Sequence, residues 1–305
     1  MDNPIIHIGY PRTATTWFQK VFYPKLKNIY FIDRNTLSDH LIFKDALRFN
    51  PFETKKYFIE QSLGKRIFIC EELLLGGLDI GYGSGEFILQ TANKVKSVIG
   101  DAEIVVFIRN QHDVLESAYS QYIKSGGTYS VEKYLGLGER FNRRFQNYHL
   151  FNPILFDYTN IINLYVNLYG KENVYVFLYE DFCSNPNHFI DNYCLKFNIP
   201  KSESFDVEKR KNIRLTSTSV FVLRFLNHFT QRNTPFKNYF TKCPSLYPYL
   251  ILLSNRVDKL KFAQRKPFRF KDDIHVWIED YYKDKNRLLA EYLDIKKLKE
   301  YKYPL

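Results

Sequence analysis

The chain is poor in the residues that would tie it together covalently or hold a structural metal. It has 305 residues but only four cysteines, which are widely spaced and form no Cys-x-x-Cys pair with a matching histidine cluster. This spacing argues against a disulfide framework and a structural zinc site, so we expect no metal. The thiols are expected to be reduced and mostly packed, at Cys70, Cys183, Cys194 and Cys243.

Long apolar runs are also missing. The longest, such as residues 247–253, are much shorter than the roughly 20 residues that span a bilayer. Residues 1–11 carry no basic leader or small-residue cleavage site, so we expect no secretory signal and a cytoplasmic protein. With 45% hydrophobic and 25% charged residues, the composition is that of a soluble globular chain and excludes a fibrous or disordered one.

Positive charge and aromatic residues are what the chain has in excess. It carries 44 Lys and Arg against 33 Asp and Glu, a formal net charge of +11, and 17% aromatic residues. Both features suit a nucleic-acid-binding protein, but no zinc-finger or single-strand-binding signature accompanies them. A low-GC genome would also enrich Phe and Tyr without functional meaning. We therefore expect no nucleic-acid partner.

Short apolar runs alternate with longer helix-like segments along the first two thirds of the chain. This alternation predicts an α/β fold in which helices cover a parallel sheet. We expect strands at residues 5–8, 66–70, 104–108 and 174–178, and helices at residues 15–22, 111–123, 159–169 and 187–197. Beyond residue 216 the periodicity predicts only helices, at residues 217–230, 246–262 and 274–292. We expect residues 1–305 to form one domain, with 216–305 as its helical C-terminal cap.

Residues 5–17, IIHIGYPRTATTW, read as a strand, a turn and the start of a helix. Backbone N–H groups at a helix start are unpaired and the helix dipole favours negative charge there, so this geometry binds anions. Against the nucleotide-triphosphate loop G-x-x-x-x-G-K-[ST], Gly9 and Thr16 align, whereas Ala14 replaces the second glycine and Thr15 the lysine. The segment has a cation at Arg12 instead.

Residues 11–17, PRTATTW, resemble the 5′-phosphosulfate loop of sulfotransferases that use 3′-phosphoadenosine-5′-phosphosulfate (PAPS) as co-substrate. The resemblance implies a three-layer, P-loop-like α/β fold. It also implies that Arg12 contacts the phosphosulfate, that Thr15 and Thr16 hold the 5′-phosphate, and that Trp17 stacks on adenine. Ala14 departs from the frequent glycine. The implied loop comprises Arg12, Thr13, Ala14, Thr15, Thr16 and Trp17. The alternative is an ordinary helix start, in which Thr13 caps the helix and Trp17 packs.

A second segment, residues 104–120, is an apolar strand that ends at Arg109 and is followed by a helix carrying Ser117. A phosphate group needs a cation and a hydroxyl that converge on one point, and these two residues can supply both. In the same sulfotransferases the 3′-phosphate site has Arg, then Asp, then Ser eight residues after the Arg. Arg109, Asp113 and Ser117 reproduce that spacing; for Ser117 alone, a solvated helix serine is the alternative.

Other parts of the chain resemble the same family less specifically. Residues 179–182 (YEDF), with Asn185 and Pro186 behind them, resemble its strand-to-helix segment, and residues 283–303 resemble the C-terminal helix and tail of bacterial members. In these enzymes the region around residue 210 closes over the nucleotide. The resemblance therefore adds cofactor-binding candidates that could equally be a solvated basic loop: Arg210, Lys211 and Asn212.

Sulfuryl transfer to a hydroxyl or amine also needs a base that accepts the acceptor's proton. Glu71 and Glu72 follow the strand at 66–70, at the sheet edge where ligands of α/β proteins bind. The resemblance implies a glutamate in carbohydrate-type enzymes and favours Glu72, with Glu71 second. A helix-capping role is the alternative for either. We expect His7 to be buried in the sheet and His112 to cap a helix.

The resemblance implies an acceptor on a glycan or glycolipid. A P-loop kinase or another nucleotide-binding phosphotransferase is the alternative, although the loop lysine is missing. Seven cations lie in residues 256–271, which we call the basic strip, with Phe262, Phe268 and Phe270 among them. The strip predicts either a solvated surface or contact with an anionic acceptor or the inner membrane surface. Its cations are Arg256, Lys259, Lys261, Arg265, Lys266, Arg269 and Lys271.

Overall fold

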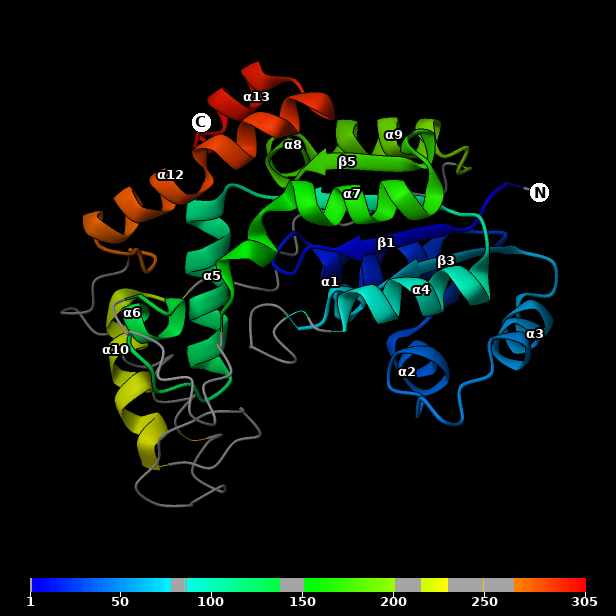
Figure 1. Cartoon of the computed structure of the whole chain (residues 1–305), viewed down its shortest axis with the longest axis horizontal. Helices are drawn as coiled ribbons and strands as arrows, with labels where there is room; N and C mark the ends of the chain where they lie inside the picture. The colour runs from blue at the N-terminus through cyan, green and yellow to red at the C-terminus, as the bar shows by residue number, and fades with distance from the viewer. Residues whose placement is uncertain are drawn as a thin grey trace.

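A five-stranded parallel sheet forms the centre of the computed structural model, which describes residues 2–77, 85, 87–137, 151–200, 215–229, 249 and 266–305 (Figure 1). The strand order is β2-β3-β1-β4-β5, and every neighbouring pair is parallel. The strands are β1 Ile5–Gly9, β2 Ile29–Ile32, β3 Arg66–Cys70, β4 Glu103–Ile108 and β5 Val174–Leu178. Four of them confirm the sequence prediction, and β2 was missed, although its apolar run is as long as the one predicted at residues 5–8.

Helices occur at the predicted places and at several others. Those at residues 15–22, 111–123, 159–169, 187–197, 217–230 and 274–292 are confirmed, the first as α1 continued by a π-helical turn. The helix predicted at 246–262 lies outside the described residues, apart from residue 249. The helices are α1 Thr15–Trp17, α2 Arg34–Leu37, α3 Pro51–Ser62, α4 Ile88–Ile99, α5 Gln111–Lys124, α6 Val131–Leu135, α7 Tyr158–Tyr169, α8 Tyr179–Ser184, α9 Pro186–Lys196, α10 Ser217–Leu226, α12 Asp272–Arg287 and α13 Ile295–Glu300.

Successive side chains of a strand point to opposite faces of the sheet, and helices bury both faces. Ile6, Ile8 and Val106 belong to the core shared with α3, α4, α5, α7 and α12. Ile5 and Phe107 belong to the other core, which α1, α8 and α9 complete. The fold is therefore α/β with three layers, as expected from the sequence. Cys70 and Cys194 are buried in the second core and Cys183 is half-buried, all three as free thiols.

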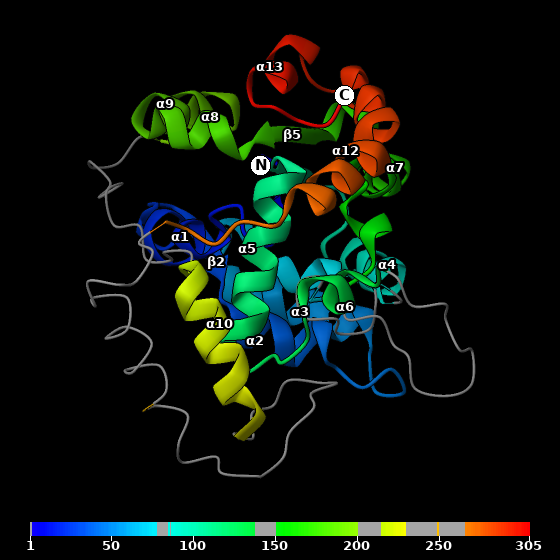
Figure 2. The same ribbon diagram turned by 90° about the vertical axis from the view of Figure 1, so that its left-hand side faces the viewer.

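The described C-terminal part is helical, as predicted, apart from one isolated antiparallel bridge between Thr216 and Pro267. Figures 1 and 2 show α10 beside α5, and α12 crossing close to α5 and α7. Buried amides join these layers, because Asn286 of α12 and Gln111 of α5 exchange hydrogen bonds of 2.8 and 3.0 Å. No helix among the described residues is long and apolar enough to cross a membrane.

The chain path explains where a ligand can bind. From β1 the chain passes β3 to reach β2, returns to β3, and then crosses β1 to reach β4. The carboxyl ends of β3 and β4 therefore flank the end of β1. Parallel α/β sheets bind ligands at such a point, where consecutive connections leave in opposite directions. The two segments singled out in the sequence follow β1 and β4 there, and Glu71 and Glu72 follow β3.

Candidate active site

The loop after β1 has an unusual backbone. Arg12 and Ala14 both have positive φ, 68° and 67°, in a region that residues with a side chain rarely adopt. Thr13 between them is buried, and its hydroxyl donates to the carbonyl of Tyr10 at 2.5 Å. The strand ends at Gly9 with a φ of 122°, which favours glycine, and a Cβ there would lie 3.3 Å from Leu75 Cδ1. Strained backbone of this kind persists where surrounding contacts impose it, commonly at functional sites.

The Arg12 side chain joins the two segments that the sequence predicts to bind anions. Its Nε donates to Ser117 Oγ at 3.0 Å, and its Nη1 donates to Gln121 Oε1 at 3.3 Å. Arg109 completes the connection, because its Nη1 donates to the backbone carbonyl of Arg12 at 3.1 Å. Two guanidinium groups and one nearly buried hydroxyl thus lie at one place, although they come from parts of the chain about a hundred residues apart.

Arg109 is held by the elements around the end of β4. Its guanidinium lies over the ring of Tyr179, 4.7 Å from the ring centre, and its carbonyl accepts from the hydroxyl of Tyr158. The next backbone N–H, of Asn110, donates to Glu180 at 2.8 Å. Burial raises the pKa of the Glu180 carboxyl, which also accepts from the Tyr303 hydroxyl at 3.1 Å. The C-terminal tail therefore helps to fix the strand end that carries Arg109.

Helix α5 presents a row of polar side chains toward Arg12. Ser117, Gln121 and Lys124 are spaced at i, i+4 and i+7, which places them on one face of a helix. The first two accept hydrogen bonds from Arg12. Burial, and secondly the positive charge of Arg12, lower the pKa of Lys124. This face of α5 therefore adds a further cation beside the guanidinium of Arg12.

The remaining loop residues differ in burial and in their role at the start of α1. Thr15 is buried, and Thr16 and Trp17 are half-buried. Ala14 rather than Thr13 occupies the N-cap position of α1, so the proposed capping by Thr13 is wrong. The Trp17 ring stacks on Phe22 at 5.9 Å and packs against Phe182 at 5.1 Å. Trp17 therefore packs against neighbouring aromatic side chains, as the helix-start alternative predicts.

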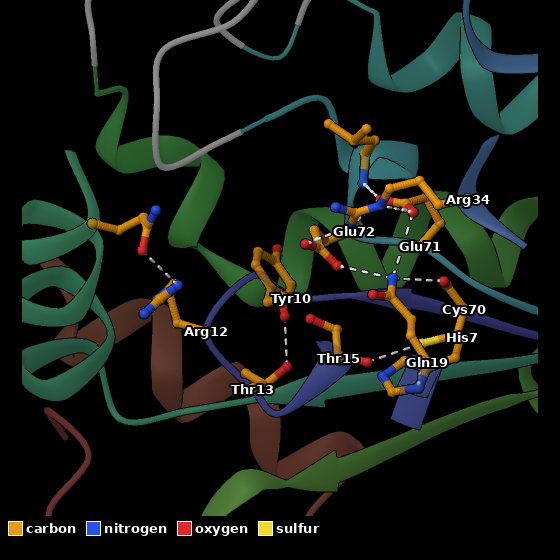
Figure 3. A network of polar contacts seen from close by, with 12 residues as sticks. His7, Tyr10, Arg12, Thr13, Thr15, Gln19, Arg34, Cys70, Glu71 and Glu72 are labelled. Carbon is orange, nitrogen blue, oxygen red and sulfur yellow. Dashed lines mark hydrogen bonds and ion pairs between the residues drawn. The ribbon is translucent and has the colours of Figure 1, made fainter. Parts of the chain in front are cut away.

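Glu71 is fully buried and bound by Arg34 of α2. Arg34 Nε donates to one carboxylate oxygen at 2.6 Å and Nη2 to the other at 2.8 Å, while the Leu73 N–H donates at 3.0 Å (Figure 3). Burial raises the pKa of the Glu71 carboxyl, and the Arg34 hydrogen bonds oppose that shift. Glu71 also occupies the N-cap position of the 3₁₀ helix Glu72–Leu75. It therefore has the contacts of a structural carboxylate.

Glu72 is the more open of the two carboxylates. Its side chain is 22% exposed, and one oxygen accepts from Arg34 Nη2 at 2.8 Å. Gln19 Nε2 lies 3.4 Å from the other oxygen and donates to the carbonyl of Cys70 at 2.8 Å. Figure 3 shows the Arg12 side chain and these carboxylates on opposite sides of Tyr10. The Arg12 side chain and the two carboxylates therefore lie on different sides of the loop.

Two histidines from the sequence analysis have different outcomes. His7 is fully buried on β1, as predicted, and burial lowers its pKa to about 3. His112 does not cap α5, because the Asn110 side chain accepts from the His112 N–H at 2.8 Å. Instead, His112 Nδ1 lies 2.7 Å from His275 Nδ1, and this contact joins α5 to α12. Its prediction as a cap is wrong because Asn110 is the N-cap residue of α5 and His112 lies within the first turn.

The other candidates lie partly outside the described residues. Arg210, Lys211 and Asn212 are among the undescribed residues, as is the basic strip up to residue 265. Asp113, assigned to the 3′-phosphate segment, accepts from Arg269 at 2.9 Å. Arg269 donates at the same distance to the fully buried Glu116, and Phe270 packs in the core. Those parts of the strip are held against α5.

Several site residues were missed by the sequence analysis. Arg34 and Gln19 contact both carboxylates, but they come from the start of α2 and from the turn after α1, where no motif marks them. Gln121 and Lys124 carry a signal that helical spacing from Ser117 could have found. Among the described residues, no cluster of three or more His, Cys, Asp or Glu side chains could hold a metal ion.

Comparisons with known proteins add little to this geometry. No protein-family model and no curated protein matches the chain. Among solved structures, the crystal structure of a sulfotransferase from Alicyclobacillus acidocaldarius is similar over 74% of this chain and 95% of that chain. The sequence identity is 16% and the TM-score is 0.47, which does not establish a shared family.

Proposed function

We propose that this chain is a sulfotransferase that moves a sulfuryl group from PAPS to an acceptor hydroxyl or amine. The observation that carries the proposal is the position of Arg12. Its guanidinium donates to Ser117 and its carbonyl accepts from Arg109, so the two segments that resemble the two phosphate sites of PAPS enzymes meet at this residue. Neither segment predicts that contact by itself.

The donors at this site suit a nucleotide with phosphate groups at both ends. A bisphosphate requires cations and hydroxyls at two points, and Arg12, Arg109, Ser117 and the Thr15–Thr16 backbone offer them. The site lacks the loop lysine through which triphosphate enzymes reach a β/γ-phosphate. When bound, PAPS supplies the sulfuryl group and leaves as adenosine 3′,5′-bisphosphate.

Different residues of the chain would neutralise charge and accept the proton. Arg12 would neutralise charge at the loop, a role in which a fixed donor stabilises the transition state more than the ground state. Glu72 would accept the proton of the acceptor, and Arg34 and Gln19 would orient its carboxylate. Glu71 is the second candidate for the base, but burial and the bidentate contact with Arg34 favour a supporting role.

The acceptor is assigned by resemblance to a hydroxyl on a glycan or glycolipid. The remaining parts of the proposal are a cytoplasmic location, no metal requirement, and contact of the basic strip, residues 256–271, with an anionic acceptor or the inner membrane surface. Phe270 is excluded from that contact surface because it is buried.

Calorimetry separates this function from the kinase alternative. Adenosine 3′,5′-bisphosphate should bind at least about a hundredfold more tightly than ATP, with no dependence on magnesium. Tight, magnesium-dependent ATP binding with weak bisphosphate binding would favour a phosphotransferase and overturn the proposal. Incubation with labelled PAPS and extracts of the source organism, followed by mass spectrometry, would then identify the sulfated acceptor.

A further inference from the structure

Helix α3 has a second apolar face that points away from the core. At 100° per residue, Phe52 and Ile59 lie within about 20° of each other around the helix, and Leu63 follows as its C-cap residue. Their side chains are 83%, 53% and 82% exposed. The opposite side buries Thr54 and Phe58 against the rest of the protein. Figure 1 shows α3 at one end of the molecule, with no described element on its outer side.

The turn before α3 extends this apolar surface. Leu47 is 97% exposed, and the Asp45 side chain holds the turn by accepting from the Leu47 N–H at 2.8 Å. Phe43, four residues earlier, is 55% exposed. Of the 14 large hydrophobic side chains that are exposed in the described part of the chain, five fall within residues 43–63. Such a concentration marks an interaction surface, whereas single exposed residues are ordinary.

Exposed cations accompany these apolar side chains. Lys55 and Lys56 follow Phe52 by three and four residues, so they flank the apolar row on α3. Residues 43–65 carry five exposed cations against three exposed acids, and one of the acids, Glu60, lies 3.9 Å from Lys56. The five are Lys44, Arg48, Lys55, Lys56 and Lys65.

We propose that α3 and the turn before it form a docking surface for an anionic lipid bilayer. The apolar side chains would enter the boundary between headgroups and acyl chains, and the lysines would contact anionic headgroups. A second copy of the chain fits less well, because a symmetric contact would bring Lys55 and Lys56 close to the same residues of the other copy. A fluid interface also accepts protruding side chains such as Leu47 without a matching recess.

This surface is separate from the candidate active site. Figure 1 shows the strands pointing away from the end of the molecule that carries α3, so docking there leaves the carboxyl edge of the sheet facing water. The surface therefore does not depend on the proposed reaction or on a lipid-linked acceptor. It also differs from the basic strip, in which Arg269 and Phe270 are hydrogen-bonded to Glu116 of α5.

Vesicle co-sedimentation of the full chain tests the proposal. We expect binding to vesicles of phosphatidylcholine with phosphatidylglycerol and much weaker binding to phosphatidylcholine alone. Replacing Lys55 and Lys56 by glutamine should lower the affinity about fivefold per lysine. The double variant Phe52→Ser/Leu63→Ser should lower it at least about tenfold.

The matched control is Leu195→Ser, which removes an 80% exposed leucine on α9 and should leave vesicle binding unchanged. All these positions are exposed, so circular dichroism and the melting temperature should match the wild type. Absence of binding by the wild type, or equal losses in the control, would overturn the proposal. So would a wild-type dimer by light scattering that the Phe52→Ser/Leu63→Ser variant converts to monomer without any vesicle binding, because the occupant would then be a second copy.

Discussion

The two sides of the β1 carboxyl end differ in charge. On the β4 side lie the cations Arg12, Arg109 and Lys124, and the hydroxyl of Ser117 accepts a hydrogen bond from Arg12. On the β3 side lie two carboxylates that share Arg34. The β1 loop separates the two sides, and Figure 3 shows Tyr10 between them. The difference separates the groups proposed to bind anions from the carboxylate proposed to accept a proton.

The largest effect should follow from breaking the cationic side. Arg12→Gln removes the guanidinium that contacts Ser117 and Gln121, and with it the charge that would stabilise the transition state. We expect kcat for sulfuryl transfer to fall about 10²–10³-fold. Steady-state kinetics with labelled PAPS would measure it. The conservative variant Arg12→Lys should recover part of the rate. A rate near wild type in Arg12→Gln would contradict the assignment.

The acidic side should separate into one residue for turnover and one for stability. Glu72→Gln should lower kcat about a hundredfold and leave the affinity for adenosine 3′,5′-bisphosphate unchanged, because only the proton acceptor is lost. Glu71→Gln should instead lower the free energy of unfolding by about 2 kcal/mol, since it weakens a buried contact with the half-exposed Arg34. Denaturant titration and calorimetry would distinguish the two.

Each carboxylate variant serves as the control for the other. Turnover close to wild type in Glu72→Gln, with unchanged nucleotide binding, would remove Glu72 from the role of base. A fall in kcat in Glu71→Gln without loss of stability would transfer that role to Glu71. Either result would sharpen the comparison, because the cationic side is unchanged in both variants.

The cationic side was largely predictable from the sequence, and the acidic side only in part. Residues 9–17 and 109–117 each combine a strand end, turn residues and a fixed spacing within a short segment. Such a local pattern can be recognised from the sequence alone. Arg34 has no such pattern. It contacts Glu71 only because β2 pairs with β3 and places α2 beside the end of β3. That pairing is a tertiary event, which the sequence pattern of a single strand does not specify.

The same reasoning explains the errors around α5. Helix formation there was predictable from its apolar periodicity, but the choice between Asn110 and His112 as the cap depended on backbone angles at the strand end. The positive φ of Ala14 was likewise hidden, because alanine rarely adopts it. A helical-wheel comparison with Ser117 would have added Gln121 and Lys124 to the site.

Removing the serine tests whether the two anion-binding segments act together. Ser117→Ala deletes the acceptor for Arg12 and one donor for a phosphate group, so the affinity for adenosine 3′,5′-bisphosphate should fall about tenfold. Isothermal calorimetry would measure it. Ser120→Ala is the matched control, since Ser120 is a buried serine of the same helix whose hydroxyl has no hydrogen-bond partner among the described residues. An equal loss in both variants would contradict the joined site.

Acid should lower the free energy of unfolding through His7, which lies on β1 between the two sides. The folded pKa of about 3 lies below the unfolded value of 6.5, so below pH 6.5 the unfolded chain binds a proton that the native chain excludes. Stability from this group is therefore complete above pH 6.5 and is lost as the pH falls toward 3. Between pH 7 and pH 5 the loss should be about 2 kcal/mol, and His7→Leu should lack it. Denaturant titrations at the two pH values give the change in the free energy of unfolding for the wild type and for His7→Leu. An equal change in both proteins would contradict a buried neutral histidine.

The smallest effect concerns the loop between the two sides. Ala14→Gly relieves a φ of 67° that a Cβ disfavours, but it also increases the entropy of the unfolded chain. The net result should be a gain of about 0.5 kcal/mol in the free energy of unfolding, measured by denaturant titration. Ala92→Gly, within α4, should have the opposite sign because a glycine in a helix interior weakens the helix. A loss of stability in Ala14→Gly would mean that Ala14 does not hold the left-handed conformation on which the position of Arg12 depends.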